Sequence, residues 1–315
     1  MAKPLDIPVP DLTGKLALVT GASDGVGLEI AARLARAGAD ILMPVRNQQK
    51  GEAAATQIAQ RTNRGSIRVL PLDLASLDSV ATLTARLNDD GRPIDLLIAN
   101  AGVMNPPTRQ VTADGFELQL ATNHLGHFAL VAQLHPLLVE AKAHVTSQVS
   151  IAADRGAVNW DDPNWEHGYD PMKAYSSSKI AFGLFAMELQ RRSDAAGWGI
   201  RSNLSHPGIT PTNLLAAQPG MGRSTDTTAV KFIRAMSRRG ILFGTASSAA
   251  LSAVYAATSP DARDGHLYGP KGFAHLSGLP AEQPMYSRLE SETDGGRVWD
   301  LSEQLTGVRV APLGR

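Results

Sequence analysis

Short apolar runs alternate with helix-like patterns along most of this chain, and that alternation restricts the fold more than any other feature of the sequence. Seven runs have the pattern of buried strands: KLALVT (15–20), ADILMPV (39–45), SIRVLPLD (66–73), PIDLLIAN (93–100), AHVTSQVSIA (143–152), GIRSNLSH (199–206) and HLYGP (266–270). Helical periodicity fills the intervals, at 25–37, 48–60, 76–88, 114–140, 173–193 and 245–257. Strands separated by helices form βαβ units, whose right-handed crossovers place helices on both faces of a parallel sheet.

The pattern predicts one α/β domain over residues 1–315, with a doubly wound parallel sheet of about seven strands. The core is expected to span residues 14–270. The segment 210–240 is rich in Gly, Pro, Thr and Ser. We expect it to be a substrate lid, because the loops that follow strand ends line the ligand sites of parallel sheets. Residues 271–315 are expected to form a loop-rich C-terminal extension with one helix near 298–305.

The composition excludes several classes of protein. Thirty basic and thirty acidic residues cancel, so no charge excess points to nucleic acid or to a membrane surface. The chain has no cysteine, which excludes disulfides, thiolate metal sites and a cysteine nucleophile. The first fifteen residues lack the apolar core of a signal peptide, and the uncharged run at 241–259 has the pattern of a buried helix. We expect a cytoplasmic protein with no membrane anchor and no metal.

A glycine-rich loop, TGASDGVG (20–27), joins the first predicted strand to the first predicted helix. Glycine permits a tight turn and a close approach of the backbone to a pyrophosphate, and the helix N-terminus behind it offers free N–H groups. In this position the loop predicts a dinucleotide site and a Rossmann fold. The expected contacts are Gly21, Ser23, Asp24, Gly25, Val26 and Gly27.

The residues after the second strand indicate which dinucleotide binds. A carboxylate there would bind the ribose hydroxyl of NAD, whereas an arginine suits the 2′-phosphate of NADP. The chain reads Pro44-Val45-Arg46-Asn47, with no carboxylate. Because a guanidinium forms forked pairs with phosphate, Arg46 predicts that NADP(H) is favoured over NAD(H).

Tyr175 and Lys179 lie four residues apart in AYSSSK (174–179), and residues at this spacing share one face of a helix. An ammonium beside a phenol favours the phenolate and lowers the phenol pKa, which suits an acid/base tyrosine. Taken alone the pair has little weight, because such spacings are common on helices. The motifs in the rest of the chain determine whether the pair is functional.

Several ordered motifs resemble the short-chain dehydrogenases/reductases over about residues 14 to 270. The glycine loop is similar to the family's T-G-x-x-x-G-x-G, and AYSSSK is similar to its Y-x-x-x-K. Ala99 and Val149 depart from the family's usual residues. The other matching segments are LDLA (72–75), ANAG (99–102), TNHLGHF (122–128), QVSIA (148–152) and HPGITPT (206–212).

The resemblance implies a catalytic set of Asn123, Ser150, Tyr175 and Lys179. Tyr175 would exchange a proton with the reacting oxygen, Ser150 would bind that oxygen, Lys179 would lower the phenol pKa and hold the nicotinamide ribose, and Asn123 would hold a relay water. Asp73 would meet the adenine. The remaining implied cofactor contacts are Leu74, Asn100, Ala101, Gly102, Pro207, Gly208, Thr210 and Thr212.

The finer resemblance is to bacterial members similar to retinol dehydrogenases and protochlorophyllide reductases. VRN (45–47), the insertion NWDDPNWEHGYDPMKAY (159–175) and the tail VWDLSEQLTGV (298–308) carry it. It implies hydride transfer between NADP(H) and a carbonyl or alcohol of a small, apolar substrate. The alternatives are reduction of an activated C=C bond and an NADP-binding regulator without catalysis. The resemblance also leaves two alternatives for self-association. Either the chain pairs its fourth and fifth helices into a homodimer or homotetramer, as the family usually does, or its C-terminal extension blocks one interface.

Two further features have simpler explanations. His124 and His127 are three residues apart, but no third metal ligand is evident, so packing or capping is expected. Trp160 and Trp165 lie in the insertion, where they either cover an apolar substrate or pin the loop to the core.

Overall fold

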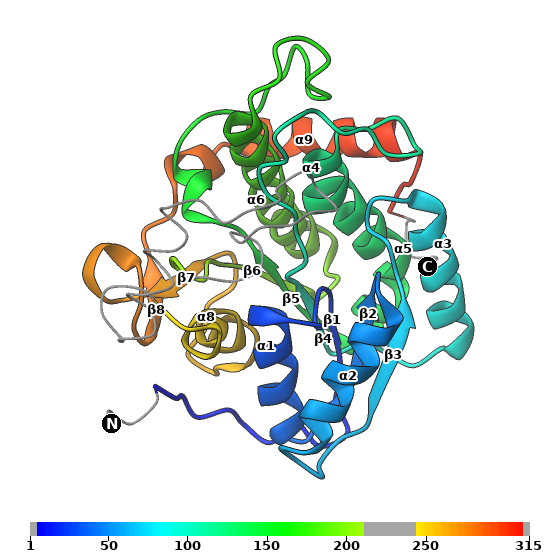
Figure 1. The fold of residues 1–315 in the computed structure, drawn as a ribbon, viewed down its shortest axis with the longest axis vertical. Helices are drawn as coiled ribbons and strands as arrows, with labels where there is room; N and C mark the ends of the chain where they lie inside the picture. The colour runs from blue at the N-terminus through cyan, green and yellow to red at the C-terminus, as the bar shows by residue number, and fades with distance from the viewer. Residues whose placement is uncertain (1–4, 211–243, 311–315) are drawn as a thin grey trace.

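The computed structural model describes residues 5–210 and 244–310. In these residues eight strands form one sheet in the order β3-β2-β1-β4-β5-β6-β7-β8 (Figure 1). Seven are parallel, and the last pair, β7 and β8, is antiparallel. The strands are β1 Leu16–Val19, β2 Asp40–Val45, β3 Ile67–Pro71, β4 Leu96–Ala99, β5 His144–Gln148, β6 Arg201–Ser205, β7 Leu267–Pro270 and β8 Pro280–Gln283.

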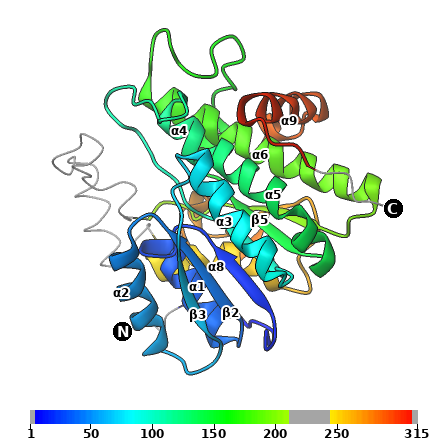
Figure 2. The same cartoon turned by 90° about the vertical axis from the view of Figure 1, so that its right-hand side faces the viewer.

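The helices cover both faces of this sheet, as Figure 2 shows. Helices α1, α2 and α8 pack on one face, and α3, α5 and α6 pack on the other. The α-helices are α1 Gly25–Arg36, α2 Gln48–Ala59, α3 Leu77–Asp90, α4 Leu118–Leu120, α5 Gly126–Ala141, α6 Pro171–Ala196, α8 Ala246–Thr258 and α9 Glu292–Thr306. Short 3₁₀ turns lie at η2 Ile151–Asp154, η4 Phe273–His275 and η5 Ser287–Leu289, and a π-helical turn lies at η1 Ala121–Leu125.

Burial of the sheet on both faces explains why its strands read as continuous apolar runs. In β1, Leu16 and Leu18 enter the core under α3, α5 and α6, whereas Ala17 and Val19 enter the core under α1 and α8. Successive side chains of a strand point to opposite faces, so a strand covered on both sides needs apolar residues at every position. The expected single doubly wound α/β domain is therefore confirmed.

The sheet has one more strand than expected. Strand β8 pairs with β7 in the register Leu267↔Gln283 and Pro270↔Pro280, and it closes the edge of the sheet. Its sequence, PAEQ, carries a proline and a charge and lacks a strand-like apolar pattern. Such residues are tolerated because this is an edge strand, where one row of backbone groups faces away from the ladder.

The long helix expected at 114–140 is interrupted. It begins at Leu118, passes through the π-helical turn η1 and continues as α5. The N–H of Gly126 donates to the carbonyl of Ala121, which closes the wider turn. Gly126 is glycine because a Cβ there would overlap the carbonyl oxygen of Leu74, where the loop after β3 approaches the helix. Single π-helical turns inside α-helices often mark functional sites.

The C-terminal extension packs against the domain. Helix α9 lies along the outer side of α6, on the side away from the sheet (Figures 1 and 2). Trp299, on α9, is 1% exposed and belongs to the main core. The expected helix at 298–305 is thus present and longer than its sequence pattern indicated. Within the described ranges no helix combines the length and apolarity needed to cross a membrane.

Candidate active site

The candidate site residues gather where the strands end. Gly21 follows β1, Arg46 follows β2, Asp73 follows β3, Asn100 follows β4 and Ser150 follows β5. The carboxyl ends of parallel strands share one edge of the sheet, and ligands of such folds bind at the point where the strand order reverses. Here that point lies between β1 and β4, which are direct neighbours.

The glycine loop is packed too tightly for side chains at two positions. Gly21 has a φ of +66°, and a Cβ there would lie 2.9 Å from the Cα of Ala101. A Cβ at Gly27 would overlap the carbonyl oxygen of Gly21 and lie 2.5 Å from Nδ2 of Asn100. Both glycines therefore keep the loop close to the segment after β4 and leave its outer side to a ligand. Asp24 caps α1 by accepting from the N–H of Gly25 at 2.6 Å.

Hydrogen bonds join the glycine loop to the loop after β4. The Thr20 hydroxyl accepts from the N–H groups of Asn100 and Ala101 at 2.9 and 3.0 Å. The Asn100 side chain donates to the Thr20 carbonyl at 2.9 Å and accepts from Nε2 of Gln148 at 2.6 Å. Thr20 and Gln148 are residues that the sequence analysis missed. Their only signal was their place beside the TG and QVS motifs.

Asn123 is fully buried in the middle of η1. Its side-chain amide forms two hydrogen bonds with the backbone of Val103. It accepts from the Val103 N–H at 2.8 Å and donates to the Val103 carbonyl at 3.0 Å. The same Nδ2 donates to the Ser178 hydroxyl at 2.9 Å. Asn123 thus links the loop after β4 to the helix that carries Tyr175 and Lys179. Ser178 was also missed, although it lies between those two residues.

Tyr175 and Lys179 lie on α6, and both are nearly inaccessible, at 3% and 4% exposed. Nζ of Lys179 donates to the carbonyl of Gln148 at 2.9 Å. A Cβ built on Gly102 would lie 3.6 Å from that Nζ and 3.0 Å from Oδ1 of Asn123, which places all three residues at one point. Ser150 caps the start of η2, and its hydroxyl accepts from the N–H of Ala152.

Burial dominates the ionisation of this cluster. It raises the pKa of the Tyr175 phenol, and hydrogen bonding to the Ser150 side chain opposes that shift. Burial also lowers the pKa of Lys179 to about 8. The net shift of the Tyr175 pKa is therefore opposite to the expected one in the protein alone. Desolvation disfavours the charged form of either group, and here it determines the direction of both shifts.

The two histidines near Asn123 are buried and hydrogen-bonded, as expected for packing. His127 lies with Nε2 3.0 Å from the Thr20 hydroxyl and Nδ1 3.3 Å from the Asn123 carbonyl. His124 lies with Nε2 2.7 Å from the Ser302 hydroxyl of α9. Burial lowers the pKa of both histidines to about 3, so both are neutral at working pH. Across the described ranges there is no cluster of three metal-ligating side chains.

The other expected contacts differ in how firmly they are held. Arg46 is exposed at the corner after β2. Asp73 is half-buried, and its carboxylate accepts from the N–H of Ala75 at 3.0 Å.

Gly208 has a φ of +69°, where a Cβ would overlap the Leu276 carbonyl. Leu74 and Thr210 are buried, and Pro207 is half-buried. Thr212 and nearly all of the expected lid lie outside the described residues.

The insertion before α6 is pinned to the core by its tryptophans. Trp165 is 8% exposed. Trp160 packs against the main core, and the guanidinium of Arg297 lies 4.0 Å from the centre of its ring. Arg297 belongs to α9, so the insertion and the C-terminal extension support one another. Of the two roles open for these tryptophans, the contacts favour the structural one.

Residues 15–221 match the family model of the short chain dehydrogenases. This chain belongs to the short-chain dehydrogenase family. It is an oxidoreductase acting on alcohol or carbonyl groups, and the family binds a nicotinamide cofactor. Gly21 and Gly27 fit that cofactor, because the loop they shape has no room for side chains and faces the sheet edge.

Retinol dehydrogenase 13 of Homo sapiens is 34% identical to this short-chain dehydrogenase over 311 residues, covering 96% of this chain and 89% of the human protein. Polyprenol dehydrogenase of Mus musculus is 34% identical over 305 residues, covering 95% and 86%. A solved structure of an uncharacterised protein from Mycobacterium paratuberculosis is 34% identical, with a TM-score of 0.76 and coverage of 96% and 97%. A structure from Beutenbergia cavernae, named as an NAD(P)-dependent gluconate 5-dehydrogenase with bound NADP at low occupancy, is 25% identical, with a TM-score of 0.60 and coverage of 82% and 95%.

Proposed function

We propose that this short-chain dehydrogenase is an NADP(H)-dependent oxidoreductase of a small, apolar carbonyl or alcohol. The observation that carries the proposal is the convergence of Asn123, Tyr175 and Lys179 in one buried cluster, with Ser150 beside the phenol. Burying an ionisable lysine and a phenol without a function is costly, and such groups in a cleft are typical of active sites.

Each residue of the cluster has a separate role in the proposed reaction. Tyr175 gives its proton to the carbonyl oxygen in reduction and takes one from the alcohol in oxidation. Ser150 donates a hydrogen bond to the same oxygen and stabilises the charge that develops there. Lys179 holds the nicotinamide ribose, and in the complex its ammonium lowers the phenol pKa against the effect of burial. Asn123 orders a water that returns the proton. When bound, the nicotinamide supplies or accepts the hydride.

The cofactor preference rests on Arg46. Strand β2 ends with Pro44-Val45 and is followed by Arg46-Asn47, with no carboxylate among these four residues, and Asn47 is occupied as the cap of α2. A guanidinium at this corner fits the 2′-phosphate of NADP. The bound NADP of the Beutenbergia cavernae structure agrees with this choice. The adenosine side is then assigned to Asp73 and Leu74, and the nicotinamide side to residues 100–102, 207, 208, 210 and 212.

The names of the relatives support the substrate class. Retinol and polyprenol, in the names of two relatives, are apolar alcohols, which supports the apolar character of the substrate but not its size. We infer a primary or secondary alcohol, or the matching carbonyl, on an apolar body. For self-association, we infer that the face formed by α5 and α6 is not fully available, because α9 lies across α6. A homodimer or homotetramer would then pair through another face.

The test is NADPH consumption with a panel of aldehydes, ketones, quinones and retinoids, run with wild type and Tyr175→Phe side by side. We expect turnover with at least one carbonyl and a fall of at least about 100-fold in the variant, because general acid catalysis contributes that much. NADPH should bind the variant nearly as tightly as wild type. A fully active variant would remove Tyr175 from its role. Tight NADPH binding without any turnover would favour the regulator, and turnover only on activated C=C bonds would favour the reductase alternative.

A further inference from the structure

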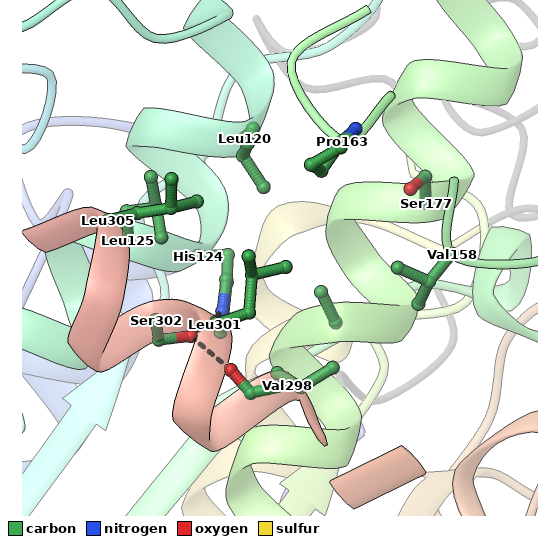
Figure 3. A pocket seen from close by; sticks show the side chains of 11 residues that line it. Leu120, His124, Leu125, Val158, Pro163, Ser177, Val298, Leu301, Ser302 and Leu305 are labelled. Carbon is green, nitrogen blue, oxygen red and sulfur yellow. Dashed lines mark hydrogen bonds between the residues drawn. The ribbon is translucent and has the colours of Figure 1, made fainter. Parts of the chain in front are cut away.

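The C-terminal helix α9 touches the π-helical turn that carries Asn123. Figure 3 shows His124 of η1 and Ser302 of α9 side by side, at the edge of a small cavity between the two elements. Nε2 of His124 lies 2.7 Å from Oγ of Ser302, and both residues are buried, at 2% and 0% exposed. A cavity this small holds neither cofactor nor substrate, so the contact belongs to the architecture of the site.

The direction of this hydrogen bond follows from the bonds around it. The Ser302 hydroxyl donates its single proton to the carbonyl of Val298 at 2.6 Å (Figure 3). Toward His124 it must therefore accept, which assigns the proton of the neutral imidazole to Nε2. Because burial lowers the pKa of His124 to about 3, the ring keeps this form across the working pH range. The bond is a constant restraint on η1.

Aromatic packing fixes α9 at this place. Trp299, one turn of α9 from Ser302, lies edge-on to Phe128 with ring centres 5.5 Å apart. His124 contacts the same Phe128 and also Phe185, with ring centres 6.5 and 6.1 Å away. Phe185 in turn lies 5.8 Å from Trp299. His124 and Trp299 thus share two buried neighbours, Phe128 and Phe185. This aromatic packing holds α9 where Ser302 contacts η1.

Asn123 depends on the shape of this turn. The turn contains one residue more than a regular helix would, and Asn123 and His124 are consecutive within it. If η1 relaxed to regular α-helix, the residues within it would rotate about the axis, since each step of an α-helix turns the side chain by about 100°. Asn123 would then lose its two hydrogen bonds with the Val103 backbone and its hydrogen bond with the Ser178 hydroxyl.

We propose that Ser302 is a positioning residue, which acts through His124 to keep η1 in the π-helical form that places Asn123. The inference deepens the proposed function, since it rests on the role of Asn123 in proton transfer. It also assigns a role to the C-terminal extension: α9 completes the catalytic cluster from outside the cofactor-binding core.

The first test compares Ser302→Ala, Ser302→Thr and the matched control Thr306→Ala. Thr306 lies one turn along α9, is partly buried and donates to the Ser302 carbonyl at 2.6 Å. Removing the Ser302 hydroxyl should lower kcat by about tenfold and raise the solvent isotope effect in D2O, because a small misplacement of a catalytic group is enough for this. KM for NADPH should stay within about twofold. Ser302→Thr should restore kcat, and Thr306→Ala should match wild type.

A second measurement does not depend on activity. Hydrogen exchange of the amides of residues 121–125 should be at least about tenfold faster in Ser302→Ala than in Thr306→Ala, because local opening of the turn controls it. Equal exchange in the two variants, or an unchanged kcat and isotope effect in a folded Ser302→Ala, overturns the positioning role. If wild type has no turnover, the proposed function fails by itself, and the exchange comparison still decides the role of Ser302.

Discussion

The proposed catalytic cluster and the Arg46 corner lie at the same end of the sheet, yet the protein holds them in opposite ways. Tyr175, Lys179 and Asn123 are almost inaccessible, and bonds to Gln148 and Val103 fix the last two. Arg46 is exposed. A buried polar group must have its partners in place before ligand arrives, whereas an exposed arginine acquires its geometry from the ligand.

This difference sets the expected sizes of mutational effects. Changes near the cluster alter preformed geometry and should be large, and they should affect turnover or folding. A change at Arg46 removes only a contact to the cofactor and should be smaller. Such a change should also leave the free protein as stable as before, because surface substitutions are usually within about 0.5 kcal/mol.

Outside the proposed catalytic residues, the largest effect is expected for Gly27→Ala. The added methyl would overlap the Gly21 carbonyl and press on Asn100, both of which are parts of rigid segments. We expect a loss of about 1–3 kcal/mol in the free energy of unfolding, typical of overpacking. Cofactor affinity should fall by about 100-fold, because a shift of the loop by about an ångström disrupts phosphate binding. Thermal unfolding and NADPH titration measure the two effects.

Gly296→Ala is the matched control. Gly296 lies inside α9, and a Cβ there would meet no atom within 4 Å. Alanine in place of glycine should therefore raise the free energy of unfolding by about 0.4–1 kcal/mol through backbone entropy. Equal destabilisation in both variants would mean that crowding at the glycine loop is not the cause.

A pH-dependent effect is expected at Lys179. Burial lowers its pKa to about 8, so the ammonium that should hold the ribose is present below that pH and lost above it. The value of kcat/KM for NADPH, which reports the free enzyme, should fall about tenfold per pH unit above this pKa. Lys179→Arg keeps its charge and should abolish the falling limb, even if its activity is lower. A falling limb at the same pH in that variant would assign the titration to another group.

The sequence was sufficient for the βαβ order, which follows from runs that are encoded locally. Family motifs also predict the set of Asn123, Ser150, Tyr175 and Lys179, whose catalytic roles stay a prediction. The glycine loop and Ser150 lie where β1 and β5 end, as expected for a parallel sheet, whereas Asn123 lies in η1 and Tyr175 and Lys179 lie in α6. Helix boundaries also held closely where caps are strong, as at Asp24, which caps α1 at its expected first residue, Gly25.

What could not be predicted depends on contacts between distant segments. The π-helical turn lies where Gly126 meets the Leu74 carbonyl and where His124 meets Ser302, 178 residues away. Strand β8 has a polar edge sequence and exists because β7 offers it a partner. The direction of the Tyr175 pKa shift depends on burial, which spacing along a helix does not reveal.

The smallest expected effect belongs to Arg46→Ala, and it tests the exposed half of the comparison. Removing the guanidinium should weaken NADPH binding by about tenfold and leave NADH binding almost unchanged, because a charge-assisted bond at an exposed site has a modest net value. Arg68→Ala is the control, since Arg68 is an exposed arginine near the opposite end of β3, paired with Asp90 at 2.7 Å. Dissociation constants for both cofactors, measured by fluorescence titration, give the ratio directly. If Arg46→Ala and Arg68→Ala leave the ratio of the two constants equally unchanged, the 2′-phosphate is held elsewhere or not held at all. If Arg46→Ala also lowers the melting temperature, the corner is part of the folded framework, and the contrast with the buried cluster is weaker than its exposure indicates.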